Sequence, residues 1–307
     1  MSRLRTILER YVHMRQGLGY KYEGPARRLS DFVSFMEARN TDTITAALAM
    51  EWVTRIGRQP TWAGRLTDVR CFAQHVAHFD PATEVPPADA VPARRRAKPY
   101  IYTDAEVEAL LAAALLLPPA RALRRWTYYC LFGLIAVTGL RHSEALKLRR
   151  DDVDLDQGVL TIRETKFGKS RLIPLHASAV VVLRGYSARR DEHLDPPRSP
   201  YFFVAEQGGQ LLHQYVHRVF WRLSRQIGLR QKGQRNGPRI HDLRHRFAVK
   251  TLINWYRAGQ DVAEQLPVLS TFLGHVGVRD TYWYLSTTPE LMSQAARLLD
   301  KCWEARS

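Results

Sequence analysis

The chain has 307 residues, of which 45% are hydrophobic and 25% are charged, a balance that is typical of globular proteins and excludes a disordered chain. No apolar run approaches the ~18 residues of a membrane span, the first residues lack the apolar stretch of a secretory signal, and the three cysteines are too scattered for a zinc site or a disulfide framework. The 46 basic residues outnumber the 30 acidic ones and give a net charge of +16, so we expect a cytoplasmic protein with a polyanionic partner, either nucleic acid or an anionic membrane surface.

The first 80 residues contain four segments in which apolar residues recur at helical spacing. These segments begin near Leu4, Leu29, Leu48 and Leu66. The pattern predicts a domain of four short helices over residues 1–80.

Residues 81–100 have a different composition, because the helical periodicity stops and prolines recur. Proline removes backbone donors and keeps a segment extended, so we predict an interdomain linker. The linker carries a basic cluster made of Arg94, Arg95, Arg96 and Lys98. These charges either follow a DNA phosphate backbone or only keep a spacer solvated, and the sequence alone favours neither hypothesis.

Residues 101–307 are expected to form a second, larger domain. Thr103 and Glu106 have the spacing of a capping box, and Gly139 is expected to end an apolar helix that runs from about 120 to 137. A β-hairpin is predicted over 158–175, with Lys166 and Lys169 near its tip. Further helices are predicted near 177–190, 212–228, 241–257, 262–274 and 289–304, with a short strand at 201–204. The expected fold class is therefore mainly α with a small antiparallel β-sheet.

One cluster of this second domain, Gly-Leu-Arg-His-Ser-Glu at 139–144, places an arginine at the start of a helix, directly after a glycine turn. Arg141 and Glu144 lie three residues apart on one face of an expected helix, so the carboxylate could hold the guanidinium in place. Such pairs are also common on solvated helix surfaces, so this motif alone is weak.

Two further clusters contain groups that can move protons or attack phosphorus. His241 and Arg244 share a helical face, which would place an imidazole beside a guanidinium that can hold an oxyanion. His275 follows a glycine, and Tyr284 comes nine residues later. A tyrosine with a pKa of about 10 is a poor nucleophile unless cations or a base activate it. Taken singly, the first pair is better explained by a basic helix that lies on DNA phosphates without chemistry, and aromatic residues such as Tyr282, Trp283 and Tyr284 more often pack in a core than form an active site.

The order of the clusters along the chain resembles the tyrosine recombinase family, also called phage-type integrases. The resemblance rests on Gly-Leu-Arg-x-x-Glu at 139–144, a lysine on a hairpin at 166, His-x-Leu-Arg-His at 241–245, and Leu-Gly-His at 273–275 followed by Tyr284. It covers residues of about 103–300. The resemblance implies that residues 1–80 form a DNA-clamping core-binding domain and that residues 101–307 form the catalytic domain. Within the family, the chain is similar to recombinases encoded by bacterial transposable elements.

The resemblance also implies a role for each matching residue. Arg141 and Arg244 would hold the non-bridging oxygens of the scissile phosphate, and Glu144 would support Arg141. Lys166 would protonate the departing 5′ oxygen, with Lys169 left open as an alternative or as a DNA contact. His241 would act as a base or acid toward Tyr284, His275 would bind the phosphate, and Tyr284 would form a 3′-phosphotyrosyl bond. No metal and no cofactor are needed by this chemistry.

The resemblance implies a site-specific recombinase that acts on double-stranded DNA as a homotetramer, alone or with sister recombinases. We accordingly expect a cytoplasmic, nucleoid-associated bacterial protein without a membrane partner. Two alternatives stay open at this stage: a type IB topoisomerase, which uses similar chemistry to relax supercoils, and a non-catalytic DNA-binding regulator, which the basic charge supports equally well.

Overall fold

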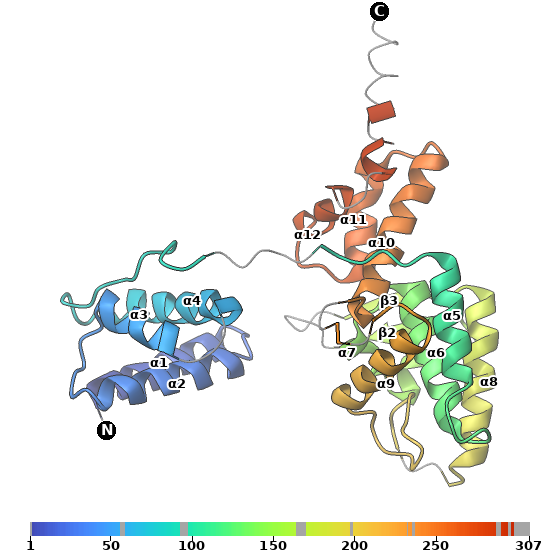
Figure 1. Ribbon diagram of the computed structural model, residues 1–307, viewed down its shortest axis with the longest axis horizontal. Coiled ribbons are helices and arrows are strands. Elements are labelled where there is room, and N and C mark those ends of the chain that lie inside the picture. Colours follow the sequence, from blue (N-terminus) through green and yellow to red (C-terminus); the bar gives the residue numbers. More distant parts are fainter. Residues whose placement is uncertain are drawn as a thin grey trace, which may run out of the picture. The chain divides into compact units, whose positions relative to one another are not determined.

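A computed structural model describes the chain in two compact units, residues 1–97 and residues 98–307, called here the first and the second unit (Figure 1). The structure describes residues 2–55, 59–92, 98–163, 170–196, 199–231, 233–234, 237–286, 290–293 and 296–297. The mainly α fold class with a small antiparallel sheet is confirmed. No helix among these residues is long and apolar enough to cross a membrane.

Four helices form the first unit, as the apolar spacing predicted. They are α1 (Arg3–Gly17), α2 (Glu23–Glu37), α3 (Ala46–Arg55) and α4 (Gln59–Val76). Their apolar faces enclose one core in which Phe32, Trp52 and Phe72 are fully buried. The indole Nε1 of Trp52 donates a 2.8 Å hydrogen bond to Asp31, so the polar end of this buried ring is satisfied.

The segment after α4 packs on the first unit, which differs from the expected linker over 81–100. The amide of Glu84 donates to the carbonyl of Ile44 at 2.8 Å, and the Glu84 carboxylate accepts the amide of Ala46 at 2.7 Å, at the start of α3. Val91 is 5% exposed and belongs to the same core. Proline-rich composition therefore marks an irregular segment here, but its first part is anchored because it caps a helix and fills the core.

Helices around a central α6 (Leu123–Thr138) form the body of the second unit. Ten of the residues of α6 are buried, and α6 packs against α5 (Asp104–Leu115), α8 (Ala177–His193) and α10 (Ile240–Arg257) (Figure 1). The predicted capping box is confirmed, since Thr103 Oγ1 accepts the amide of Glu106 at 3.2 Å and Glu106 accepts the amide of Thr103 at 2.8 Å. The remaining long helices are α9 (His213–Gln226) and α11 (Val262–Leu273).

The predicted hairpin is present as β2 (Val159–Ile162) and β3 (Arg171–Pro174), and β1 (Val153–Asp154) adds a third antiparallel strand in the order β1-β2-β3. Leu160 pairs with Ile173, and both side chains are fully buried, which fixes the register. The hairpin tip at 164–169, with Lys166 and Lys169, lies outside the described residues.

The prediction of a short strand at 201–204 is wrong. Tyr201 and Val204 form isolated bridges with Arg149 and Gln210 instead. Consecutive residues of this segment, including Phe202 and Phe203, are buried in the core, so its β-like composition reflects burial rather than strand pairing.

Short helical segments lie between or after the long helices of the second unit. They are α7 (His142–Ala145), the 3-10 turn η1 (Arg150–Asp152), α12 (Arg279–Tyr282) and the 3-10 turn η3 (Trp283–Ser286). A separate core joins α10 and α11 to Tyr284 and Leu291. Residues 290–293 and 296–297 are helical, whereas the rest of the helix expected at 289–304 lies outside the described residues.

The turn between α6 and α7 depends on a glycine, and this dependence can be tested. Gly139 has φ +63°, and a Cβ at this position would lie 2.5 Å from Phe247 Cδ1 and 3.0 Å from Leu273 Cδ2. Gly139→Ala should therefore lower the free energy of unfolding by about 2–4 kcal/mol, through backbone strain and overpacking. Urea unfolding of the full chain measures this change.

Gly209→Ala is the matched control, because nothing lies within 4 Å of its Cβ position and its φ is not in the left-handed region. The control should change the free energy of unfolding by less than about 0.5 kcal/mol. Equal losses in the two variants would contradict the steric explanation.

Candidate active site

Arg141 stands at the start of α7, immediately after the turn that Gly139 makes at the end of α6. Its guanidinium donates to the carbonyl of Gly274 at 2.9 Å and to Glu144 Oε1 at 2.9 Å. Glu144 Oε2 also accepts the Arg141 amide at 3.0 Å. The predicted support of Arg141 by Glu144 is therefore seen as a direct contact, and the side chain of Arg141 keeps 31% of its surface exposed.

Arg244 projects from α10 into the interior and is 1% exposed. It donates to the carbonyl of Gly139 at 2.8 Å and to that of Leu273 at 2.7 Å. Burial lowers the pKa of Arg244 to about 10, and the positive charge of Arg141 acts in the same direction, while Tyr284 opposes them. The two arginines predicted to bind one phosphate therefore meet where the ends of α6 and α11 come together.

A third guanidinium, which the sequence analysis did not assign to the site, lies beside Glu144. Arg171, the first residue of β3, donates to Glu144 at 2.8 and 3.2 Å and to the carbonyl of Phe272 at 2.8 Å. Its side chain is 8% exposed. Gly274 permits this approach, because a Cβ there would lie 2.5 Å from Arg171 Nη1. Spacing along the chain gives no signal that a residue of the hairpin reaches α11.

Arg141, Arg171 and Arg244, called here the guanidinium cluster, donate to the carbonyls of three consecutive residues, 274, 272 and 273, at the end of α11. The last carbonyls of a helix lack intrahelical partners and carry partial negative charge. Burial opposes ionisation of Glu144, but hydrogen bonds from Arg171 and the Arg141 amide prevail, so the pKa of this carboxyl lies below its ordinary value. Fixed acceptors therefore hold all three cations in place.

The two predicted histidines border this cluster. Burial, together with the nearby charge of Arg244, lowers the pKa of His241 to about 4. Burial and the charges of Arg244 and Arg141 likewise lower the pKa of His275 to about 4. His275 Nδ1 is 2.7 Å from Thr281 Oγ1, so one ring nitrogen is held while the other is available on the far side of the ring. Both imidazoles are neutral at pH 7.

Tyr284 lies on η3 and is 2% exposed, whereas Tyr282 is 52% exposed. The Tyr284 hydroxyl is 3.2 Å from Nδ1 of His245, and its ring lies parallel to that of His275 with 6.1 Å between centroids. The sequence assigned the proton-transfer role to His241, one turn earlier on α10. The structure instead shows His245 at the hydroxyl, with the His241 ring 4.7 Å from the His245 ring.

The structure therefore brings Arg141, Glu144, Arg244, His275 and Tyr284 into one region of the second unit. Two residues that the sequence analysis did not assign, Arg171 and His245, complete it. His245 could have been found because it lies in the same motif as His241. The expected DNA-binding residues Arg94, Arg95 and Arg96 lie outside the described residues, and Lys98 is exposed.

Known proteins share both this sequence and this fold. The model of the phage integrase family matches residues 101–290. The protein y4rB of Sinorhizobium fredii, whose name describes an integrase/recombinase, is 50% identical over the full length of both chains. The Tn1549 transposon integrase in complex with transposon right end DNA has a TM-score of 0.66 at 14% identity, covering 96% of this chain and 99% of that one. XerH bound to its difH substrate has a TM-score of 0.65 at 20% identity, covering 91% and 79%. The chain therefore belongs to the phage integrase family, the tyrosine recombinases that cleave and rejoin DNA at specific sites.

Proposed function

We propose that Tyr284 is the nucleophile of this recombinase and that Arg141 and Arg244 bind the scissile phosphate. The supporting observation is that backbone carbonyls hold both guanidiniums, and that the charge of Arg244 interacts with both Arg141 and Tyr284. The phenolic oxygen attacks phosphorus, the bond to the 5′ oxygen breaks, and a 3′-phosphotyrosyl ester forms. A new 5′ hydroxyl then attacks this ester and releases Tyr284, so rejoining needs no ATP.

Electrostatic preorganisation explains why buried arginines suit this reaction. Negative charge accumulates on the non-bridging oxygens as phosphorus becomes five-coordinate, and fixed cations stabilise it without reorganising. Two of the five N–H donors of Arg244 bond to carbonyls and fix the side chain, which leaves further donors for a phosphate. Arg171 contacts Glu144, and Glu144 in turn contacts Arg141, so we assign Arg171 a positioning role toward the phosphate.

The protons follow two routes in this proposal. His245 accepts the proton of Tyr284, because its Nδ1 is at hydrogen-bond distance from the hydroxyl, and His241 lies beside it to accept charge. A bound phosphate adds negative charge, which raises the pKa of His241 from its low value in the DNA-free protein. A lysine of the hairpin tip, Lys166 or Lys169, protonates the leaving 5′ oxygen.

Duplex DNA is the substrate that the net charge of +16 favours. One tyrosine cleaves one strand, and exchange between two duplexes requires four cleavages. We therefore propose that four protomers assemble on DNA, with the first unit and the basic residues 94–98 as its clamp. Membership in the phage integrase family favours this function over a type IB topoisomerase or a non-catalytic regulator.

Replacing the nucleophile gives the most direct test. Tyr284→Phe removes the attacking oxygen, so no covalent protein–DNA adduct should form on a nicked suicide substrate, while DNA affinity stays nearly unchanged. Denaturing gel electrophoresis detects the adduct. Tyr282→Phe is the matched control and should keep it, since this exposed ring stands two residues away. An adduct that persists in Tyr284→Phe would overturn the assignment.

The role of Glu144 can be separated from that of an ordinary ion pair. Glu144→Ala leaves two largely buried guanidiniums without their carboxylate and should cost about 3 kcal/mol in the free energy of unfolding, with a loss of adduct formation. Asp156→Ala removes an ion pair with Arg184 whose side chains are 87% and 59% exposed. This control should cost less than about 1 kcal/mol. A loss in Glu144→Ala no larger than in the control would show that the contact is dispensable.

Stability of the DNA-free protein should fall as the pH decreases from about 6.5 to about 4. The unfolded chain binds protons at its histidines near pH 6.5, whereas burial keeps His241 and His275 neutral until their folded pKa of about 4. The unfolded state therefore takes up more protons in this window, and the free energy of unfolding decreases with falling pH.

Urea unfolding across this pH range measures the effect. The double variant His241→Gln, His275→Gln should have a shallower pH dependence than the parent, while His13→Gln, on an exposed residue of α1, should keep the parental slope. An unchanged slope in the double variant would contradict the buried, neutral state of these rings.

A further inference from the structure

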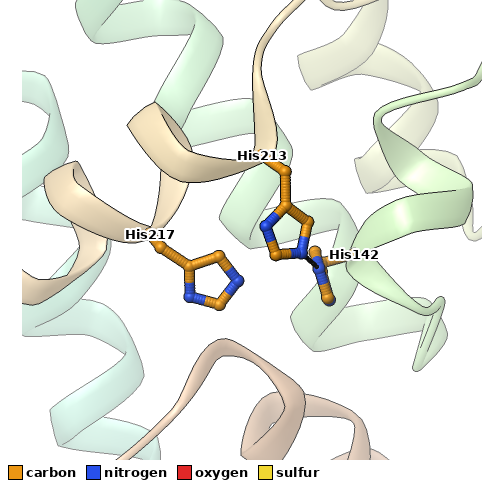
Figure 2. A group of neighbouring side chains, drawn as sticks. All are labelled: His142, His213 and His217. Carbon is orange, nitrogen blue, oxygen red and sulfur yellow. Dashed lines mark hydrogen bonds between the residues drawn. The ribbon is translucent and has the colours of Figure 1, made fainter. Parts of the chain in front are cut away.

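A group of three histidines outside the proposed reaction lies on one side of the second unit. His213 is the first residue of α9, His217 follows one turn later on the same helix face, and His142 is the first residue of α7. Figure 2 shows the imidazoles of His142, His213 and His217 turned toward one another from these two elements. We call this group the histidine trio.

The rings lie close enough for their nitrogens to share one ligand. The ring centroids are 4.4 Å apart between His142 and His213, 4.4 Å between His213 and His217, and 5.1 Å between His142 and His217. One nitrogen from each ring lies within 4.8 Å of the other two. The Nε2 atoms of His142 and His213 are in direct contact (Figure 2).

This arrangement is costly without a shared cation. Three imidazoles that face each other repel when they are protonated, and each neutral ring has only one N–H with which to bond to its neighbours. Nδ1 of His142 is buried and has no hydrogen-bond partner among the described residues, so its contacts at Nε2 decide the orientation of the ring. A divalent ion satisfies all three lone pairs at once.

The donor set indicates the class of ion. Imidazole nitrogen suits Zn²⁺, Ni²⁺ and Cu²⁺, whereas Mg²⁺ and Ca²⁺ prefer oxygen. Nitrogens around one tetrahedral zinc ion, each ~2.0–2.1 Å from it, lie roughly 3.4 Å apart. Small rotations of the exposed His213 ring and the partly exposed rings of His142 and His217 therefore reach this geometry. A fourth position stays open for water.

We propose that His142, His213 and His217 bind one divalent transition-metal ion, with Zn²⁺ as the ion tested here, and that this ion ties α9 to the segment that carries Arg141. The peptide bond between Arg141 and His142 makes this link short. The ion takes no part in the strand-transfer chemistry, which uses other residues. The site stands independently of the proposed function, since it rests on side chains with no role in that function.

Metal binding is tested directly on the full, tag-free chain after treatment with a chelator. Calorimetric titration with Zn²⁺ should show one tight site per chain, and Co²⁺ should develop the visible absorption bands of a tetrahedral nitrogen site. Because Zn²⁺ binds the folded state, it should also raise the Tm in a concentration-dependent manner.

Single substitutions identify the ligands. His213→Gln and His217→Gln should each weaken Zn²⁺ binding by at least about 100-fold and abolish the Co²⁺ bands, since loss of a ligand costs more than loss of an outer contact. His13→Gln, an exposed histidine of α1, is the matched control and should bind as the parent does. Far-ultraviolet circular dichroism verifies that both variants fold, which their place on the surface of α9 favours.

Three results would overturn the proposal. They are the absence of a one-to-one Zn²⁺ site in the parent, equal affinity in the parent and the two α9 variants, and a loss of DNA affinity in these variants without any metal binding by the parent. The last result would assign the histidine trio to phosphate contacts instead. Adduct formation by Tyr284 is unaffected by the first two results, so failure here is distinguishable from failure of the proposed function.

Discussion

The convergence of three guanidiniums on the end of one helix organises the second unit. Arg141, Arg171 and Arg244 come from the α6–α7 turn, from β3 and from α10, and each donates to a carbonyl at the end of α11. These carbonyls need partners because no further helical turn supplies amides to them. The interaction thus joins the α6–α7 turn and β3 to a helix end more than a hundred residues away in sequence, and it makes the guanidinium cluster part of the fold itself.

The guanidinium cluster contains more positive than negative charge. One carboxylate, that of Glu144, is shared by Arg141 and Arg171, while Arg244 donates to the carbonyls of Gly139 and Leu273 and interacts with Glu144 through its charge. Burial and the neighbouring cation lower the pKa of Arg244 to about 10, which measures the cost of keeping this charge inside the protein. In the proposed function, a bound phosphate would offset this cost, because its negative charge would lie beside the buried cations.

Histidines surround this positive region in two functionally different groups. His241, His245 and His275 border Tyr284 and the guanidinium cluster, and burial together with the neighbouring cations keeps His241 and His275 neutral. The histidine trio forms the second group, because its rings are turned toward one another (Figure 2). A metal ion there would stiffen the segment next to Arg141 and leave the proton transfers to the first group.

The sequence by itself determined the helical first domain, the capping box at Thr103, the hairpin and the identity of most candidate site residues. The helices, the capping box and the hairpin depend on periodicity and turn residues, which act over a few residues. The site residues were identified from the order of motifs along the chain. The composition of residues 81–100 predicts a linker, and Glu84 and Val91 within it contact the first unit, because proline marks irregular backbone whether or not that backbone packs. The strand expected at 201–204 was wrong for a related reason, since a buried irregular segment has the same residues as a strand.

Only the tertiary structure decided which side chains touch. Arg171 reaches Glu144 and α11 because β3 is folded against the end of that helix, and no spacing along the chain encodes this contact. His245 rather than His241 meets the Tyr284 hydroxyl because the rotation of α10 and the position of η3 are set by packing. The histidine trio likewise exists only where α7 meets α9, since its members are separated by some seventy residues. A feature formed by neighbouring residues can be predicted from the sequence, whereas a site built from distant elements depends on how those elements pack.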